Sequence, residues 1–285
     1  MVKKITVFDV VNYTILFLLV VVTLYPFIYV LAVAFNDSSD TVKGGIWILP
    51  RVWTLANFKA AFQSDLIYNS IVISVSRTVI TTLLALVLNL MLAYAFLDKK
   101  LVGRKFLLKF MFIPTLFSGG IIPWFMLVRD LGLVDSFLLY VIPALYGFYT
   151  MVILRTAFEG VPDSIPEAAK IDGANDFTIL FRFYIPLSMP AIATIALFTG
   201  VAQWNDWFAG EFYISNEKLK PAATVLRQLV TEASGGSMNP SGGVITNTQS
   251  LQMAFLVITV LPILCVYPFL QKYFVQGVLI GGVKE

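Results

Sequence analysis

The chain has 285 residues, of which 58% are hydrophobic and only 13% are charged. Soluble domains carry about 25% charged residues, so this composition excludes an ordinary soluble protein and indicates an all-α integral membrane protein. The net charge of +3 is small and the basic residues lie in loops, which argues against a nucleic-acid partner. Histidine is absent, which removes the commonest metal ligand and proton shuttle, and the single cysteine, Cys265, allows no internal disulfide.

Six stretches are apolar and long enough to cross a bilayer, which takes about 20 residues of helix. They are residues 10–35, 70–97, 107–128, 136–157, 185–209 and 250–272. The first is longer than the core of a secretory signal, about 7–15 residues, so we interpret it as a membrane span. Proline and glycine interrupt several spans, which fits either static packing or a moving pathway. We interpret the whole chain, 1–285, as one transmembrane domain.

Orientation in the membrane follows from lysine and arginine, which collect in short cytoplasmic loops. With six spans, the basic groups at 3–4, 99–109, 155–182 and 272–284 all fall on one side. Both termini, including a tail at 273–285, are therefore predicted to be cytoplasmic.

The charged segment 163–186 between the fourth and fifth spans is predicted to form two short helices at the cytoplasmic surface. Ser164 and Glu167 have the spacing of a capping box at the start of the first helix. Gly173 is a natural stop for that helix. The two small residues between them, Ala168 and Ala169, would let a partner protein approach closely; the alternative is a surface-lying linker without a partner.

The second helix of this segment can be capped by Asn175 or Asp176, since both residue types favour that position. Four apolar residues then recur at helical spacing, which predicts a single apolar face. They are Phe177, Leu180, Phe181 and Tyr184.

The 163–186 segment resembles the EAA loop of importer-type ABC permeases, in which E-A-A, three residues, G and nine residues precede I-x-L-P. Here Glu167-Ala168-Ala169 is followed at that spacing by Gly173 and Phe183-Tyr184-Ile185-Pro186, with apolar residues in place of the usual Ile and Leu. The resemblance implies a type I ABC importer permease fold whose coupling helix seats in a cytoplasmic ATPase. The residues it assigns to this seating are Glu167, Ala168, Ala169, Asp172 and Gly173.

Other stretches extend the resemblance to the smaller, maltose-permease-like subunit of carbohydrate importers. They are WNDWF at 204–208, the ending KYFVQGVLIGGVKE, NDS after the first span, the stretch at 47–58 and YNSIVISV at 68–75. Within the family, GGIWILPRVWTLANF at 44–58 is most similar to permeases for complex or acidic oligosaccharides, such as alginate and pectin fragments. The resemblance implies a bacterial plasma-membrane protein that works with a second homologous permease and an extracytoplasmic solute-binding protein. It also implies a cytoplasmic ATPase dimer that holds ATP and Mg, while this chain binds no cofactor itself.

Polar and aromatic residues within the spans are candidates for a substrate pathway, because tryptophan faces stack on sugars and amide or carboxylate groups bond their hydroxyls. Tryptophans near the end of a span can instead form an interfacial belt, and a buried amide can instead join two helices. The candidates are Trp204, Asn205, Asp206, Trp207, Asn89 and Gln203. Arg77 is expected to extend its guanidinium to the headgroups. The Gly/Ser-rich 234–243 could be a finger that touches a binding protein, or simply a flexible loop.

The energy source is expected to lie in a partner subunit. No Gly-Lys pair occurs, so the chain lacks the G-x-x-x-x-G-K-[ST] loop that binds ATP phosphates. The span centres hold no Asp or Glu, which disfavours a self-sufficient ion-driven carrier or channel. An intramembrane enzyme is a third alternative, disfavoured because a nucleophile–base pair is hard to assemble without histidine.

Overall fold

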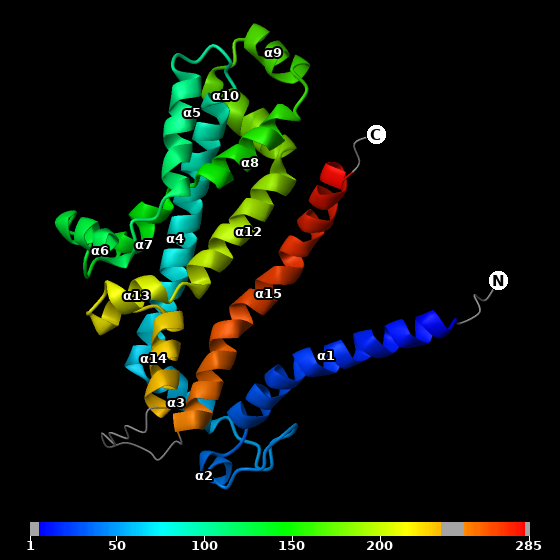
Figure 1. The fold of residues 1–285 in the computed structure, drawn as a ribbon, viewed down its shortest axis with the longest axis vertical. Coiled ribbons are helices and arrows are strands. Elements are labelled where there is room, and N and C mark those ends of the chain that lie inside the picture. Colours follow the sequence, from blue (N-terminus) through cyan, green and yellow to red (C-terminus); the bar gives the residue numbers. More distant parts are fainter. Residues whose placement is uncertain (1–5, 235–247, 283–285) are drawn as a thin grey trace. The chain divides into compact units, whose positions relative to one another are not determined.

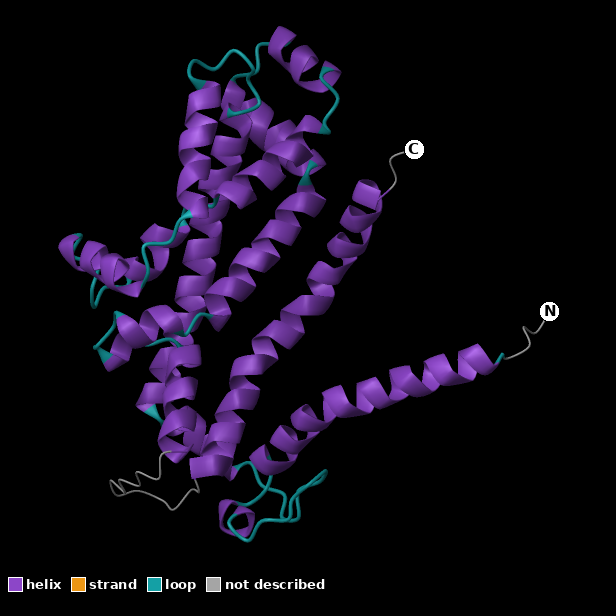
Figure 2. Cartoon of the chain, in the orientation of Figure 1, coloured by secondary structure: helices purple, strands orange, loops and turns teal. Residues whose placement is uncertain are grey.

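The structure is a computed structural model that describes residues 6–234 and 248–282 (Figure 1). Over these residues the regular elements are helical, and Figure 2 shows helices joined by loops with no strand among them. The chain forms two compact units, one made of Met1–Tyr68 with Val225–Pro262 and the other of Asn69–Thr224 with Ile263–Glu285. The Gly/Ser-rich finger expected at 234–243 lies outside the described residues except for Ser234.

The first unit begins with the membrane helix α1, Val7–Ala34. A capping box starts the helix: the Asp9 N–H donates to the Thr6 hydroxyl at 3.3 Å, and the Thr6 N–H donates to Asp9 Oδ2 at 2.9 Å. At about 1.5 Å per residue, 28 residues reach about 42 Å, which exceeds the hydrocarbon thickness of a bilayer. Most of its apolar side chains are exposed in the isolated chain, as expected for a helix that faces lipid or another subunit.

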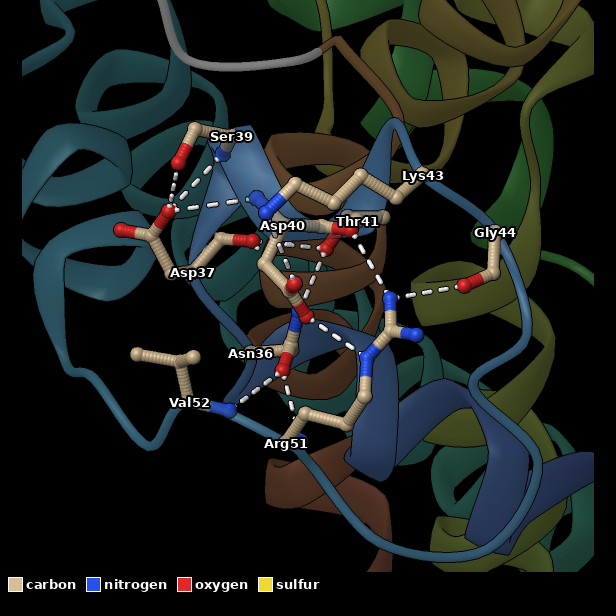
Figure 3. A network of polar contacts seen from close by, with 9 residues as sticks. All are labelled: Asn36, Asp37, Ser39, Asp40, Thr41, Lys43, Gly44, Arg51 and Val52. Atoms are coloured by element: carbon tan, nitrogen blue, oxygen red, sulfur yellow. Dashed lines mark hydrogen bonds and ion pairs between the residues drawn. The ribbon is translucent and has the colours of Figure 1, made fainter.

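After α1, a polar network fixes the loop that contains α2, Ser38–Thr41, ahead of α3, Ala56–Gln63 (Figure 3). Asn36 is fully buried, and its side-chain oxygen accepts the backbone N–H groups of Arg51 at 2.8 Å and Val52 at 2.9 Å. Its amide nitrogen donates to Asp40 at 3.2 Å, and Asp40 accepts a second hydrogen bond from Arg51 Nε at 2.8 Å. One buried amide therefore closes a loop that spans 15 residues of sequence.

The remaining elements follow in chain order. They are α4 Asp65–Ala95, α5 Arg104–Phe112, η1 Ile113–Leu116, α6 Ile121–Asp130, α7 Leu138–Val141, η2 Ile142–Ala144, α8 Phe148–Glu159, α9 Ser164–Ile171, α10 Asp176–Ile179, the π-helical turn η3 Leu180–Tyr184, α11 Ile185–Leu187, α12 Met189–Asn205, α13 Phe208–Phe212, η4 Glu217–Leu219, α14 Ala222–Ser234 and α15 Thr248–Gly282.

Within the described residues, three helices are long and apolar enough to cross a membrane by themselves: Val7–Ala34, Asp65–Ala95 and Gln249–Val266. Two further candidates are bent pairs, each of which can count as one broken span. They are Leu138–Ala144 with Phe148–Glu159, bent by 52°, and Asp176–Leu187 with Met189–Phe212, bent by 84°.

The stretch 107–128, predicted as one continuous span, is divided among α5, η1 and α6. Pro114 lies at the start of η1, where its ring fits a new turn but cannot continue the hydrogen bonds of α5. Gly120, with φ of 83° and ψ of −177°, then holds the backbone outside any helix before α6 begins. At the other end of the chain, α15 continues as a helix as far as Gly282, and the cytoplasmic tail at 273–285 stays a prediction.

Candidate functional site

The first helix of the 163–186 segment, α9, begins one residue earlier than a capping box requires. Asp163 is its N-cap residue, without a side-chain cap bond, and the Glu167 N–H donates to the Asp163 carbonyl at 3.1 Å. The predicted capping box of Ser164 with Glu167 is therefore wrong. The physical reason is that the turn already starts at Pro162, whose carbonyl accepts the Ile165 N–H at 3.1 Å, so Ser164 lies inside the helix.

The end of α9 agrees with the predicted stop at Gly173. Its φ of +82° lies in the left-handed region that glycine favours, and a Cβ there would meet nothing within 4 Å. The Gly173 N–H donates to the Lys170 carbonyl at 3.0 Å and the Ala174 N–H to the Ala169 carbonyl at 2.9 Å, which is the Schellman arrangement. The requirement for glycine is thus conformational rather than steric.

The second helix of the segment, α10, is capped by Asn175, one of the two predicted candidates. The Thr178 N–H donates to its side-chain oxygen at 2.8 Å. Of the four residues predicted to form one apolar face, Leu180 and Tyr184 are buried, whereas Phe177 and Phe181 are 60% and 52% exposed. The two pairs lie side by side along α10 and η3, and the rest of the chain covers only Leu180 and Tyr184.

The residues assigned to ATPase seating lie mostly on the surface of α9 and its turn. Glu167, Ala168, Asp172 and Gly173 are exposed, and near them Ile171 exposes 87% of its surface. Ala169 instead is 6% exposed and belongs to the core of the chain itself. The segment therefore presents the carboxylates of Glu167 and Asp172 beside the exposed apolar side chain of Ile171.

The segment is held firmly against the membrane helices α4 and α8. The Tyr94 hydroxyl of α4 donates to the Asp176 carboxylate at 2.9 Å. The Tyr184 ring packs between Tyr94, at 5.4 Å between centroids, and Phe158 of α8, at 5.2 Å. After α11 the chain bends by 84° and continues as α12, so the segment is also joined to that helix through the backbone.

The other end of α12 holds a buried ionic cluster, which we call the Arg77 cluster: Arg77, Tyr140, Gln203 and Asp206. Figure 1 shows α9 and α10 near one end of α12 and α13 near its other end. Arg77 is 1% exposed. Its Nη2 donates to Asp206 Oδ2 at 2.6 Å and to Gln203 Oε1 at 3.1 Å, and its Cζ lies 4.2 Å from the centre of the Tyr140 ring.

The expectation that Arg77 reaches the headgroups is therefore wrong. The packing of α4 against α12 is close at this level, since a Cβ on Gly200 of α12 would lie 3.6 Å from Thr82 Oγ1 and 3.8 Å from Thr78 Cγ2. Arg77 lies in the interior of this unit, where an ionised group needs a partner and finds one in Asp206. A lone arginine in one span and a lone acid near the end of another were the available sequence signal.

Asp206 also organises the break between α12 and α13. Its carbonyl accepts a hydrogen bond from Arg77 Nη1 at 3.1 Å. Its Oδ1 accepts the N–H groups of Phe208 at 2.9 Å and Ala209 at 3.4 Å, so one side chain caps the start of α13 and pairs with Arg77.

Two cavities adjoin at this cluster and share Trp124 and Tyr213. The smaller cavity has a volume of about 180 Å³ and is also lined by the Arg77 cluster. The larger has a volume of about 550 Å³ and is also lined by Phe117, Phe208 and the Ser-Gly-Gly stretch at 118–120. Together they offer aromatic faces, an amide, a carboxylate and a guanidinium. Such a mixture suits a polar ligand with apolar C–H faces.

The six predicted pathway residues do not converge on one place. Gln203 and Asp206 line the smaller cavity. Trp204 is buried, Asn205 is exposed, and Trp207 meets Phe208 edge to face with ring centres 5.7 Å apart. None of these three lines either cavity. Their role in a pathway stays a prediction.

Asn89 is 1% exposed and joins α4 to the break in the neighbouring span. Its amide donates to the carbonyls of Leu145 at 2.8 Å and Ala85 at 2.7 Å, and its oxygen accepts the Gly147 N–H at 3.2 Å. These bonds satisfy backbone groups that the break before α8 leaves without helical partners. The structure thus contains the helix-joining alternative, while a pathway role for Asn89 stays a prediction.

These features, membrane helices with a surface segment and a polar internal cluster, define a transport protein, and comparison with known proteins gives its family. The family described as "Binding-protein-dependent transport system inner membrane component" matches residues 100–280. The chain belongs to this family.

Relatives and a solved structure narrow the class. The chain is 38% identical to the polygalacturonan/rhamnogalacturonan transport system permease protein YtcP of Bacillus subtilis, over 97% of this chain and 98% of that protein. It is 35% identical to protein LplC of the same organism, over 98% and 95%. A crystal structure of a bacterial ABC transporter involved in the import of the acidic polysaccharide alginate contains a chain that matches with a TM-score of 0.87 and 28% identity, over 94% and 96%.

The chain is thus a membrane-embedded permease subunit of a binding-protein-dependent ABC importer for sugars or oligosaccharides, with the fold of type I ABC permeases. ATP hydrolysis in such importers is the task of a partner subunit. The sequence-based assignment to this family is confirmed.

Proposed function

We propose that this chain moves acidic oligosaccharides across a bacterial plasma membrane and is driven by a cytoplasmic ATPase through its 163–186 segment. The observation that carries the proposal is an exposed α9–Gly173–α10 turn that is bound to the membrane helices by Tyr94 and Tyr184. A docking surface that is stiffly attached to α12 can transmit force, whereas a loosely attached surface linker would absorb it.

In the proposed assembly the chain is one transmembrane domain with six crossings, the third being the broken stretch 107–128. Both termini and the 163–186 segment face the cytoplasm. A second, homologous permease completes the pathway, a solute-binding protein delivers substrate on the outer side, and lipid surrounds the rest. ATP and Mg reside in the ATPase dimer, and nucleic acid has no role.

Each part of the segment has a proposed task in coupling. Glu167, Ala168 and Asp172 contact the ATPase, and the exposed apolar Ile171 enters its docking cleft. Gly173 holds the turn between the two helices, and Ala169 keeps α9 on the core of the chain. Closure of the ATPase dimer then moves α12 and rocks the two permeases between inward-open and outward-open states.

The acidic character of the substrate is supported by the names of two relatives and by this chain's own charges. YtcP is named for pectin-type polymers and the solved importer for alginate, and both kinds of polymer carry uronic acids. A buried arginine that borders a cavity supplies a group able to bond a carboxylate.

The deciding experiment compares Gly173→Asp with Gly132→Asp in the purified transporter complex in proteoliposomes. Both glycines are exposed with positive φ, +82° and +68°, and neither Cβ would meet an atom within 4 Å, so both variants carry the same backbone strain. We expect Gly173→Asp and Glu167→Ala to abolish uptake and binding-protein-stimulated ATP hydrolysis, and Gly132→Asp to retain both. Full stimulation in the Gly173→Asp complex would refute coupling through this segment, and uptake by the isolated chain on an ion gradient would instead support a secondary carrier.

A further inference from the structure

The two adjoining cavities differ in chemistry. Phe117, Trp124, Phe208 and Tyr213 give the larger cavity aromatic faces, and the non-helical backbone at 118–120 forms part of its wall. Aromatic faces stack on the C–H surfaces of sugar rings, and backbone groups in such a wall bond hydroxyls. The smaller cavity is instead lined by Arg77 together with Gln203 and Asp206.

The guanidinium of Arg77 has unused bonding capacity. Of its five N–H donors, three are engaged: one with the Asp206 carbonyl, one with Gln203 and one with the Asp206 carboxylate. Nε has no hydrogen-bond partner within the part of the chain that the structure describes, although it is buried. A buried donor without a partner is unfavourable, so its retention in a residue that lines a cavity points to a ligand that satisfies it.

Asp206 is the more exposed member of the ion pair. Its side chain is 33% exposed whereas that of Arg77 is 2% exposed, so an incoming group meets Asp206 first. A buried arginine requires an anion, and one carboxylate can replace another without leaving the cation unpaired. A neutral sugar cannot make this exchange, because it would leave Arg77 without a counter-charge.

We propose that these cavities form a subsite for one uronic-acid residue of the transported chain, with Arg77 as the group that selects the acid. The sugar ring stacks in the aromatic cavity beside Trp124. Its carboxylate bonds the free Nε and the neighbouring Nη2 of Arg77, and the Asp206 carboxylate, already 33% exposed, leaves Nη2 for solvent. No covalent step occurs, since one hydrogen-bonded ion pair is exchanged for another. This inference rests on the proposed function as an oligosaccharide importer.

The exchange predicts opposite effects for the two members of the ion pair. Arg77→Gln removes the carboxylate-binding group and should lower the preference for an acidic sugar over its neutral form at least tenfold. Asp206→Asn keeps an oxygen for the amides of Phe208 and Ala209 but no longer competes for Arg77, so it should raise that preference. Trp124→Ala should lower the uptake of acidic and neutral sugars by the same factor, because it removes only the stacking on the sugar ring.

The test measures uptake by the complete transporter in proteoliposomes, as kcat/KM for oligogalacturonate of one length and for its fully methyl-esterified form. The binding protein contributes equally to every variant, so its own selectivity cancels when variants are compared. Arg129→Gln is the matched control, since Arg129 is 57% exposed and paired with the adjacent Asp130, and should leave the ratio unchanged. Arg77→Lys keeps the charge and tests whether the effect of Arg77→Gln reflects lost charge or lost folding.

Two outcomes overturn the subsite. One is an equal loss of uptake for the acidic and the methyl-esterified sugar in both Arg77→Gln and Asp206→Asn, which would mean that the ion pair is purely structural. The other is an unchanged ratio in all variants, which would place acid selection elsewhere. A wild-type complex that carries neither form, with ATP hydrolysis intact, would instead refute the proposed acidic substrate itself.

Discussion

Arg77 and Asp206 are 129 residues apart in sequence, yet Nη2 of the first lies 2.6 Å from Oδ2 of the second. The contact joins the middle of α4 to the point where α12 ends, and Arg77 is buried while doing so. A pair in this position binds two membrane helices together and at the same time borders a cavity. Stability and substrate binding are therefore expected to compete for the same charges.

Removing one member of this pair should cost more stability than removing both. Asp206→Leu leaves the buried Arg77 charge without its partner, which costs about 3–5 kcal/mol in comparable buried pairs. Arg77→Met leaves Asp206, which is 33% exposed, so its cost should be smaller. The double variant leaves no charge behind and should recover much of this loss. Thermal unfolding of the purified complex in detergent, run as a double-mutant cycle, measures the difference. Additive losses would mean that the two groups do not interact.

Gly210 is expected to tolerate no side chain. A Cβ there would overlap Thr224 Oγ1 and lie 2.7 Å from Pro221 Cδ, so Gly210→Ala must push α14 away from α13. Overpacking of this kind typically costs about 1–3 kcal/mol. Gly200→Ala is the control, because its Cβ would meet Thr82 Oγ1 at an ordinary 3.6 Å. A larger drop in melting temperature for Gly200→Ala than for Gly210→Ala would contradict the packing described.

Tyr94→Phe should loosen the 163–186 segment without unfolding the bundle. It deletes the hydrogen bond to Asp176, worth about 1 kcal/mol, and keeps the ring that packs on Tyr184. Faster amide exchange in α10 and weaker stimulation of ATP hydrolysis are expected, with normal membrane insertion. Tyr146→Phe is the comparison, since its hydroxyl makes only a 3.4 Å contact with the Met111 carbonyl. Identical exchange in the two variants would argue against a role for Tyr94 in anchoring.

The loop network around Asn36 should be sensitive to acid alone. Hydrogen bonds from Ser39 hold the pKa of Asp37 below its usual value, and those from Asn36 and Arg51 do the same for the pKa of Asp40. Because both folded-state pKa values are lowered, the ionised groups contribute stability that is complete above about pH 4 and is lost as the pH falls through the lowered values. Amide exchange at Arg51 and Val52, corrected for intrinsic rates, should rise only below about pH 4. A rise between pH 5 and 7 would show that another group controls the loop, and Asp40→Asn should remove most of the effect.

Features that depend only on neighbouring residues, such as where a helix begins and ends, could be predicted from the sequence. Long apolar runs predict helices α1, α4 and α15 because burial in lipid needs only length and composition. Gly173 predicts the end of α9, and Asn175 the start of α10, because each acts on backbone groups within four residues of itself. The E-A-A-x-x-x-G pattern identified the family for the same reason, since a docking helix is a short contiguous unit.

Only the tertiary structure decided the roles of Arg77, of Asn89 and of the apolar residues of α10 and η3. Arg77 turns inward because it meets Tyr140, Gln203 and Asp206, which lie far along the chain and which no local spacing encodes. Asn89 finds its partners at a helix break 56 residues away, and Leu180 is buried rather than Phe177 because of which neighbours cover it. Periodicity gives the directions in which side chains leave a helix, and long-range packing determines what each of them meets.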